Sequence, residues 1–513
     1  TVRYVVHETV VSCPGCRQEV AASAAQKSGR ANLCPTCSTK LRFNRESMTR
    51  TRVVEVLRGK SVLKDASEIE TQERLAETPI ANVDVDPYDK PFVENRRTLT
   101  YAGMTTSDLF TPRNMSALAL IAAAIDEAGD ERVQSALRLV LTSGAASSSR
   151  LIAYRAGMTG GGPAWSVPGF WVPPTHLESN PLGHLKARVA KFERALDAMS
   201  GSGRIQAPGR VVNEDARTAL KNLHSSGRKA DLVFLDPPYG DSVPYLEFGA
   251  MWNAFLGQDV SPRDDISVSN RTTDNGGWGA YVDGLNSVIA SVEDILAPQG
   301  RILLTFNNND QRAWNALLGA LQSSGFACVD VAYQFPAVVP AKAQFSPSSS
   351  YVGDLYSVWE RSIAAPVAVD TVRSELHAAL RRCASARGGL IAENLARRAA
   401  MVEVVKSNAD ASDVSKVDVW LEEWFTETDG FLRWNGDLDT SVLPVAEQVV
   451  ATAEQLLTSK PRIAWTQLIE QVAETCADIG VPDIGEIGAI LREKFEVDRL
   501  WVSRRHVQES FDL

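Results

Sequence analysis

Between residues 204 and 362 the chain alternates short apolar runs with amphipathic segments, and this pattern restricts the fold more than any other feature. Such alternation is typical of α/β proteins, in which helices connect the parallel strands of one sheet. The predicted strands are 210–213, 231–235, 301–306, 326–334 and 354–360. The predicted helices are 216–224, 246–256, 281–296 and 311–323. We therefore expect an α/β fold built on a parallel sheet.

The second predicted strand leads directly into an acidic, proline-rich loop. The run Asp231–Leu235 is followed by Asp236, Pro237, Pro238 and Tyr239. Proline has a fixed φ and no N–H group, so the carbonyl groups of this loop are expected to be held in place. A carboxylate and a carbonyl can accept hydrogen bonds from an exocyclic amine, and an aromatic ring can stack on a base that has left its duplex. The alternative is an ordinary turn, because Asp-Pro and Pro-Pro both favour turns. We favour a loop that handles a nucleobase amine.

Four of the seven cysteines form two close pairs near the N-terminus. Cys13 and Cys16 form one CxxC motif, and Cys34 and Cys37 form a second after seventeen intervening residues. This spacing predicts a structural zinc ion held by four thiolates. A redox-active CxxC is disfavoured because a second matched motif would be redundant. Reduced thiols indicate a reducing compartment, so we expect a cytoplasmic protein.

The net charge restricts how the chain can contact nucleic acid. It is −10 at neutral pH, with a pI of about 5.3. Proteins covered by nucleic-acid-binding surface are basic, so any contact with phosphates is expected to be local. Lys40–Lys64 is the best candidate, and a solvated basic face is the alternative. The sequence has no apolar run long enough to span a membrane and no secretory signal pattern, so no membrane contact is expected.

The length of 513 residues predicts several domains. We expect a zinc ribbon at residues 1–60, a connector at 61–97, a helical and loop insertion at 98–203 that is a candidate for target recognition, a catalytic region at 204–362, and a helical C-terminal domain at 363–513. Within this last domain, residues 465–502 suggest a winged helix, although a plain helical bundle is the favoured alternative. No internal repeat is evident in the sequence.

Taken together, these motifs resemble the bacterial zinc-ribbon-containing adenine-specific DNA methylases, which use S-adenosylmethionine. The resemblance covers roughly residues 1–362. It depends on the paired CxxC motifs, Leu109–Asn114 (LFTPRN), Asp236–Asp241 (DPPYGD), Val243–Tyr245 (VPY), Leu304–Asn308 (LTFNN) with Trp314, and Gly353–Asp354. The implied fold is a Rossmann-like methyltransferase sheet with an N-terminal zinc ribbon, and the implied partners are DNA, S-adenosylmethionine and zinc. Restriction–modification or phage defence is the biological setting typical of such enzymes.

The resemblance also implies roles for individual residues. Asp236 and the Pro237 carbonyl would hold the target amine in the loop completed by Pro238, and Tyr239 would stack on the flipped base. Tyr245 is a second stacking candidate. Asp215 and Asp236 would contact the cofactor, although an acid in the position of Asp215 is often only a helix N-cap. Adenine N6 is favoured over cytosine N4 because the loop begins with Asp.

The chain departs from the family pattern at the cofactor side. Family members carry a glycine-rich loop after a strand, and the only glycine-rich candidate, Gly157–Pro163, follows no predicted strand. We therefore expect an incomplete N-terminal half of the sheet, with the missing loop supplied by a partner chain or by a preceding segment. Two alternatives remain: a non-catalytic DNA-binding or specificity subunit that keeps the methylase scaffold, and an RNA base methyltransferase.

Overall fold

The computed structural model describes most of the chain and divides it into two compact units. The described residues are 2–29, 31–44, 47–59, 61–154, 169–201, 209–259, 261–269, 277–334, 354–362, 366–428, 431–476, 479, 484–498 and 501–504. Unit 1 comprises residues 1–211, 244–265 and 269–276, and unit 2 comprises 212–243, 266–268 and 277–513. The domain boundaries expected from the sequence divide the chain more finely, and they stay predictions.

Unit 1 is built around a five-stranded antiparallel sheet. Its central strand β1 (Val2–Ser12) pairs with β6 (Met48–Arg58) along one side and with both β2 (Glu19–Ala21) and β8 (Thr175–Ser179) along the other, while β7 (Ser61–Leu63) extends β6. A smaller sheet contains β3 (Gln26–Ser28), β4 (Ala31–Leu33) and β5 (Lys40–Leu41). Because β8 pairs with β1, the zinc-ribbon segment and the 98–203 segment share one sheet.

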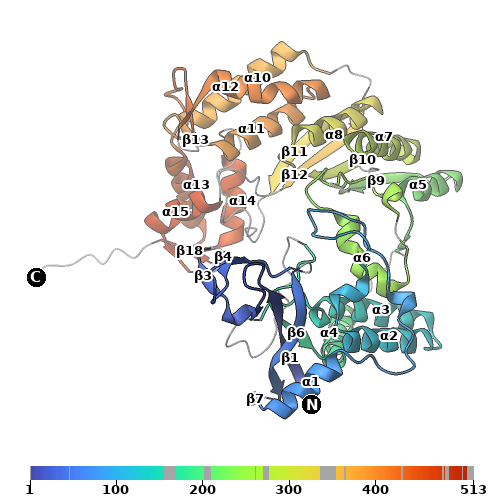
Figure 1. The fold of residues 1–513 in the computed structure, drawn as a ribbon. Helices are drawn as coiled ribbons and strands as arrows, with labels where there is room; N and C mark the ends of the chain where they lie inside the picture. The colour runs from blue at the N-terminus through green and yellow to red at the C-terminus, as the bar shows by residue number, and fades with distance from the viewer. Residues whose placement is uncertain are drawn as a thin grey trace, which may run out of the picture. The chain divides into compact units, whose positions relative to one another are not determined.

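Helices complete unit 1 (Figure 1). They are α1 (Ala66–Ala76), α2 (Pro112–Asp126), α3 (Glu131–Ala145), α4 (Pro181–Gly201) and α6 (Tyr245–Leu256), with 3-10 turns η1 (Ala22–Ala24), η2 (Asp86–Tyr88), η3 (Thr106–Leu109), η4 (Ala146–Ser148) and η5 (Pro262–Asp264). The start of α2 follows from its sequence: Thr111 caps the helix by accepting a hydrogen bond from the backbone N–H of Asn114, and Pro112 occupies the first turn, where no N–H is needed.

A buried carboxylate, Glu178 of β8, organises the polar interior of unit 1. Its Oε1 accepts hydrogen bonds from Thr111 Oγ1 at 2.8 Å and from Arg113 Nε at 2.9 Å, and its Oε2 lies 2.7 Å from His7 Nε2. Arg113 also donates to Gln72 Oε1 at 2.9 Å. Burial acts to raise the pKa of Glu178, but the hydrogen bonds from His7 and Arg113 outweigh it and lower the pKa to about 2. The LFTPRN segment thus joins α1, α2, β1 and β8.

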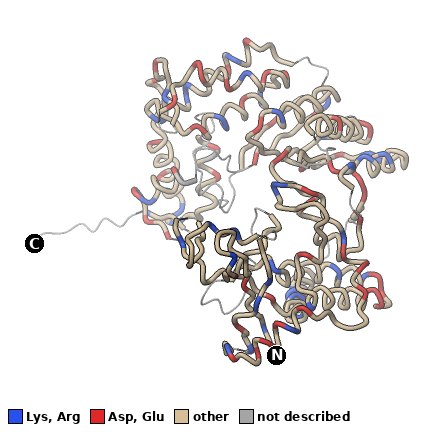
Figure 2. The backbone as a smooth tube through the Cα atoms, in the orientation of Figure 1, with Lys and Arg blue, Asp and Glu red and all other residues tan. Residues whose placement is uncertain are grey.

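The basic stretch Lys40–Lys64 is partly neutralised within unit 1. Acidic and basic residues are interspersed along the backbone (Figure 2). Four of the basic side chains of this stretch form ion pairs: Arg50 with Glu19, Arg52 with Glu8, Arg58 with Glu68, and Lys64 with Glu55. These pairs favour the alternative of a solvated face over a dedicated phosphate-binding surface.

Unit 2 contains a four-stranded sheet in the order β11–β12–β10–β9. Strands β9 (Ala230–Leu235) and β10 (Leu296–Phe306) are parallel, whereas β12 (Asp354–Arg361) runs antiparallel to both β10 and β11 (Phe326–Gln334). The expectation of a parallel sheet was therefore wrong for β12 alone, since β11 runs in the same direction as β9 and β10. No helix was predicted between β11 and β12, and strands without a crossover helix pair antiparallel. The strand predicted at 210–213 was also wrong, since the described residues 209–213 have no regular structure.

Helices cover one face of this sheet. They are α5 (Ala216–Ser225), α7 (Trp278–Ile295) and α8 (Gln311–Ser323), and α7 lies beside α8 (Figure 1). The bounds predicted for α8 are confirmed. Ile302, Leu304 and Phe306 alternate along β10 and are buried in the core that these helices share with the sheet. Burying such alternating side chains fixes which face of β10 the helices cover.

The C-terminal part of unit 2 repeats one order of elements. The first copy is α10 (Val369–Ser385), β13 (Leu390–Ala392), α11 (Glu393–Lys406), η6 (Ala411–Lys416), α12 (Val417–Trp424), β14 (Phe425–Thr428) and β15 (Phe431–Trp434). The second is α13 (Val445–Ser459), β16 (Arg462–Ala464), α14 (Trp465–Thr475), α15 (Ile484–Lys494), β17 (Glu496–Val497) and β18 (Trp501–Ser503). In each copy the last strand lies at the centre of a three-stranded antiparallel sheet, as in a winged helix. The structure thus contains a repeat that the sequence did not reveal.

The first copy is fixed to the sheet of unit 2. The Asn408 side chain donates to the Cys328 carbonyl of β11 at 2.8 Å, and the Arg398 guanidinium lies 4.6 Å from the centroid of the Tyr333 ring. The second copy is tied to the first through Arg387, which donates to the Ile479 carbonyl at 2.9 Å. These contacts make the first copy a support for β11.

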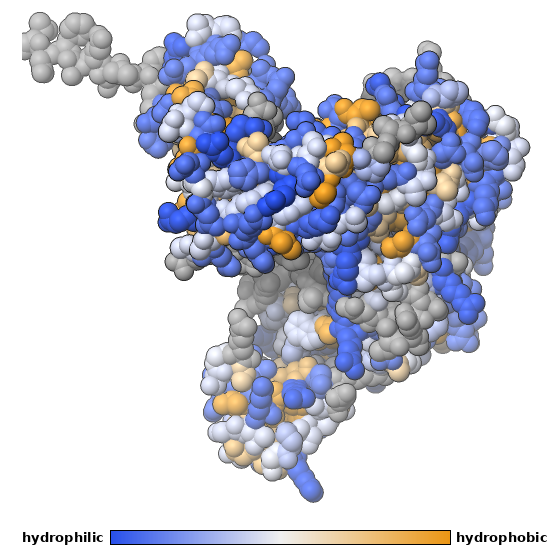
Figure 3. Space-filling model, turned by 90° about the horizontal axis from the view of Figure 1, so that it is seen from above, coloured by the Kyte–Doolittle hydropathy of each residue, from blue (hydrophilic) through white to orange (hydrophobic). Residues whose placement is uncertain are grey.

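The surface seen in Figure 3 is mostly hydrophilic, with small and separate apolar patches. Among the helices of the described residues, none is long and apolar enough to cross a membrane.

Candidate active site at the carboxyl end of β9

The DPPY loop begins where β9 ends. The register pairs Leu235 with Leu304 of the parallel neighbour β10, so Asp236 lies at the carboxyl edge of the sheet. Ligand crevices of open α/β sheets form outside the carboxyl ends of the strands. The structure therefore places the predicted loop at the edge of the sheet where α/β proteins bind ligands.

Two side chains fix the carbonyl groups of the loop. The Tyr281 hydroxyl of α7 donates to the Pro238 carbonyl at 2.8 Å, and Asn308 Nδ2 donates to the Tyr239 carbonyl at 2.8 Å. By contrast, the Pro237 carbonyl has no hydrogen-bond partner among the described residues. The Asp236 residue is exposed. The loop is thus held at its second half, while one carbonyl and one carboxylate remain open to a ligand.

Gly240 allows the loop to turn close to its support. Its φ is +54°, in the left-handed region that favours glycine. A Cβ atom there would lie 3.0 Å from Asn308 Nδ2 and 3.1 Å from Ala313 Cβ. The close approach of the backbone to Asn308 depends on this glycine.

Tyr239 packs against the sheet beneath the loop. Its ring meets Phe306 edge-on, with the centroids 5.3 Å apart. Burial, followed by the charges of Asp354 and Asp236, raises the pKa of its hydroxyl. Stacking of Tyr239 on a base stays a prediction.

A second carboxylate, Asp354, lies at the same edge. It opens β12, where the register pairs Leu355 with Phe306. Burial and the nearby charge of Asp236 raise the pKa of Asp354. Gly353–Asp354 forms part of the sequence motif described above, but no role in the site was predicted for it. The support that Tyr281 gives the loop was not predicted either, because it depends on a contact between distant segments.

Asp215 and Tyr245, the other two predicted site residues, lie outside the DPPY loop. Asp215 caps α5 by accepting a hydrogen bond from the Arg217 backbone at 2.8 Å, and the Arg217 side chain lowers its pKa. This is the N-cap role that the sequence left open, and a cofactor contact by Asp215 stays a prediction. Tyr245 is the first residue of α6, in unit 1, so its role as a second stacking residue also stays a prediction.

The other side of β9 is open. It is the edge strand of its sheet, and Leu232 and Phe234 are 61% and 56% exposed. Strands of parallel α/β sheets are normally covered on both faces, so this exposure is unusual. The described residues contain no strand on this side and no glycine-rich loop that could hold S-adenosylmethionine. Gly157–Pro163 lies outside the described residues.

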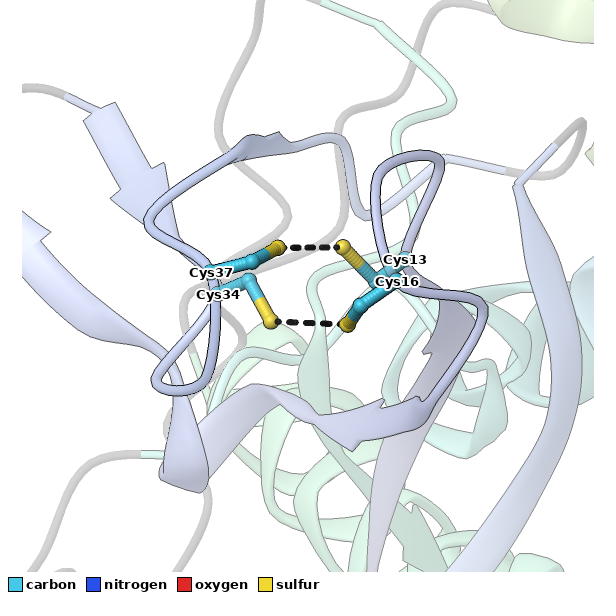
Figure 4. Close-up of side chains that lie close together, drawn as sticks. All are labelled: Cys13, Cys16, Cys34 and Cys37. Carbon is cyan, nitrogen blue, oxygen red and sulfur yellow. Dashed lines mark hydrogen bonds between the residues drawn. The ribbon is translucent and has the colours of Figure 1, made fainter.

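The four cysteines of unit 1 converge from two turns (Figure 4). Cys13 Sγ lies 3.5 Å from Cys37 Sγ, and Cys16 Sγ lies 3.7 Å from Cys34 Sγ. Four thiolates around a zinc ion, with Zn–S bonds of about 2.3 Å, would lie about 3.8 Å apart. All four sulfur atoms lie within 4.8 Å of one another, so the cluster could hold zinc.

The two cysteine turns have matching backbones. The Arg17 N–H donates to the Cys13 carbonyl at 2.8 Å, and the Ser38 N–H donates to the Cys34 carbonyl at 2.9 Å. Arg17 and Ser38 both have positive φ, at 61° and 59°. Repeating this tight geometry on both sides aims each pair of thiols at the same point.

Comparison with known proteins gives limited matches. No family model matches the chain, and no curated protein matches it. Among solved structures, the M1.HpyAVI complex with S-adenosylmethionine is 16% identical, with a TM-score of 0.18, over 31% of this chain and 57% of that chain. A TehB-like S-adenosylmethionine-dependent methyltransferase from Corynebacterium glutamicum ATCC 13032 Kitasato is 13% identical, with a TM-score of 0.13, over 34% of this chain and 100% of that chain. TM-scores this low do not establish a shared fold, so the proposal below depends on the residues of the site.

Proposed function

We propose that this chain carries the target-base side of an S-adenosylmethionine-dependent amino-methyltransferase that acts on DNA, with adenine N6 as the favoured acceptor. One observation carries the proposal. The Pro238 and Tyr239 carbonyls are tied down, whereas the Asp236 carboxylate and the Pro237 carbonyl face the carboxyl edge of the sheet without a partner for that carbonyl among the described residues. Two acceptors in one rigid loop suit the two N–H groups of an exocyclic amine.

The roles of the site residues follow from this arrangement. Asp236 and the Pro237 carbonyl would each accept one hydrogen bond from the amine, and these bonds would draw its lone pair away from the base ring. Tyr281 and Asn308 would keep the acceptors in place. S-adenosylmethionine would supply the electrophilic methyl group. Because positioning provides much of the rate in such reactions, a rigid loop is an advantage.

The cofactor side of the site is proposed to come from another polypeptide segment. An open edge strand presents unpaired N–H and C=O groups, and exposed apolar residues on such a strand promote pairing. A parallel strand added beside β9 would pair with its open edge and create a crevice next to Asp236. Leu232 and Phe234 project from one face of the sheet, so the helix that accompanies such a strand would cover them. We propose that a partner chain, or a segment preceding residue 1, provides this strand and the glycine-rich loop.

Methyl transfer in the assembled enzyme tests the function. The chain is combined with the protein encoded by the neighbouring reading frame, and transfer of a labelled methyl group to duplex DNA is measured. We expect Asp236→Ala to reduce transfer at least about 100-fold, the effect typical of removing one group that stabilises a transition state, while DNA binding is retained. Asp231→Ala, an exposed acid at the other end of β9, is the matched control and should leave transfer unchanged. Full transfer by Asp236→Ala would favour the non-catalytic specificity subunit.

Cofactor binding by the chain alone tests whether another polypeptide segment is needed to complete the cofactor-binding part of the site. Calorimetry with S-adenosylmethionine should show no tight binding until the partner or preceding segment is added. Tight binding by residues 1–513 alone would contradict an incomplete site.

The alternatives differ in what they bind and modify. The open side of β9 is compatible with a DNA-binding subunit that has no activity, but such a subunit does not need a fixed DPPY loop. An RNA base methyltransferase would use the same acceptors. Parallel assays with duplex DNA, single-stranded DNA and RNA, followed by analysis of the methylated nucleosides, separate DNA from RNA and adenine from cytosine.

A further inference from the structure

Asp354 faces the same edge of the sheet as the DPPY loop. We propose that Asp354 is a second catalytic carboxylate, which accepts the proton that the amine nitrogen loses when it is methylated. This inference rests on the proposed function and adds to it a residue that the loop motif does not contain.

The strand register brings the two carboxylates to opposite sides of β10. Asp236 follows the Leu235–Leu304 pair on β9, and Asp354 precedes the Leu355–Phe306 pair on β12. Strands β9 and β12 both flank β10, so their backbones are two strand spacings apart, about 10 Å. A gap of this order between two short side chains accommodates one nitrogen with a hydrogen-bond acceptor on either side.

Tyr239 lies near both acids. Burial raises the pKa of its hydroxyl, and the charges of Asp354 and Asp236 also act to raise it. Asp236 is exposed, whereas Asp354 is half-buried, and this burial together with the charge of Asp236 raises the pKa of Asp354. Two neighbouring carboxylates whose environments differ divide into a hydrogen-bond acceptor and a stronger base.

A purely structural role does not account for Asp354. Among the described residues, no Lys or Arg forms an ion pair with it. Half-burying an unpaired acid beside a second acid costs stability that Asn or Ser at the start of a strand would avoid. Such unfavourable charge placement in a crevice is typical of functional sites.

The chemical step balances with the residues named. The amine nitrogen uses its lone pair to form a bond to the methyl carbon of the sulfonium donor. The bond between that carbon and sulfur breaks, and its electron pair stays on sulfur. The nitrogen then carries a positive charge and two hydrogens; one stays hydrogen-bonded to Asp236, and the other leaves the Pro237 carbonyl and passes as a proton to the ionised Asp354. The products are a neutral methylamine, a thioether and a protonated carboxyl, which releases its proton to solvent.

Kinetics of the assembled enzyme test the role. We expect Asp354→Asn to lower kcat at least about 100-fold, as for loss of a general base, with little change in KM or DNA binding. The acidic limb of the pH–kcat profile should disappear with it. Asp231→Asn is the matched control and should keep both the rate and the profile. A wild-type rate and profile in Asp354→Asn would remove the proposed role while leaving the methyltransferase intact.

A second measurement needs no activity. Fluorotyrosine is introduced only at position 239 of the full chain, and its fluorine resonance is followed against pH. We expect a titration step above the usual pKa of an aspartate, absent in Asp354→Asn and moved to lower pH in Asp236→Asn. Absence of this step in the wild type would overturn the inference. If the assembled wild type transfers no methyl group to any base, the proposed function is refuted, and the role of Asp354 is refuted with it.

Discussion

Replacing Glu178 with Gln should destabilise unit 1 strongly at neutral pH and progressively less in acid. The substitution keeps the shape of the side chain but removes the charge that Arg113 and His7 contact at 2.9 and 2.7 Å. The Arg113 guanidinium would then lose its anionic partner in a largely buried position. Removing one member of a buried charge pair is among the more damaging changes that a folded protein can receive.

The magnitude follows from the pKa of Glu178. It is lowered from 4.5 to about 2, because the hydrogen bonds from His7 and Arg113 outweigh the effect of burial. At about 1.36 kcal/mol per pKa unit, the ionised group contributes about 3 kcal/mol at pH 7. A group with a lowered pKa in the folded state contributes fully above its unfolded pKa and loses the contribution as pH falls towards its folded value. Roughly half should remain at pH 3.

Urea unfolding read by hydrogen exchange of peptides from β1 and β8 isolates unit 1 from the rest of the chain. Glu178→Gln should show a deficit of about 3 kcal/mol at pH 7 that shrinks at pH 3. Burial lowers the pKa of His176 to about 3 and the charge of Glu178 acts to raise it, so the difference at pH 3 also contains the change in His176 protonation. Glu127→Gln, at the exposed end of α2, is the control and should match the wild type. A deficit near zero at pH 7, or one that does not change with pH, would refute the reasoning.

Three further predictions concern zinc, the loop and the open edge. Purified chain should contain about one equivalent of zinc by elemental analysis, and Cys34→Ser should lose it whereas Cys328→Ala should not. Gly240→Ala should lower methyl transfer at least about 10-fold by moving Asn308, whereas Gly227→Ala should have little effect on transfer, since it shares a positive φ but has no neighbours within 4 Å. Replacing Leu232 and Phe234 together with Glu should abolish cofactor binding in the assembled enzyme, measured by calorimetry, while Val329→Glu on the opposite edge strand should preserve it.

Local patterns in the sequence predicted the local elements well. The apolar run 231–235 forms β9, and the predicted helix 311–323 matches α8 at both ends because Asp310 caps its start. The cysteine cluster was also predictable, since the spacing of thiols in two turns depends only on short segments. In each case the interactions that decide the structure lie within a few residues.

Long-range features were not predictable in this way. The reversed direction of β12 depends on its pairing with β10 and β11, and the described segment 210–213 forms no strand. Tyr281 reaches the loop from 43 residues away, and Asn308 from 69. The sequence around such a hydroxyl or amide group does not indicate which distant residue it contacts. The site could therefore be located from its loop, but its supports could not.

Strand β9 is both the proposed site of pairing with the partner segment and the strand that leads into the DPPY loop. β9 is both the open edge of the sheet and the strand that delivers Asp236, so a parallel strand that pairs with this edge must end beside the loop. An exposed apolar edge carries a risk of aggregation that proteins normally remove with charges or bulges. The open edge of β9 is explained if the proposed neighbouring strand also brings the cofactor-binding loop. The two halves would then form the crevice only when joined, and methyl transfer should appear together with burial of this edge.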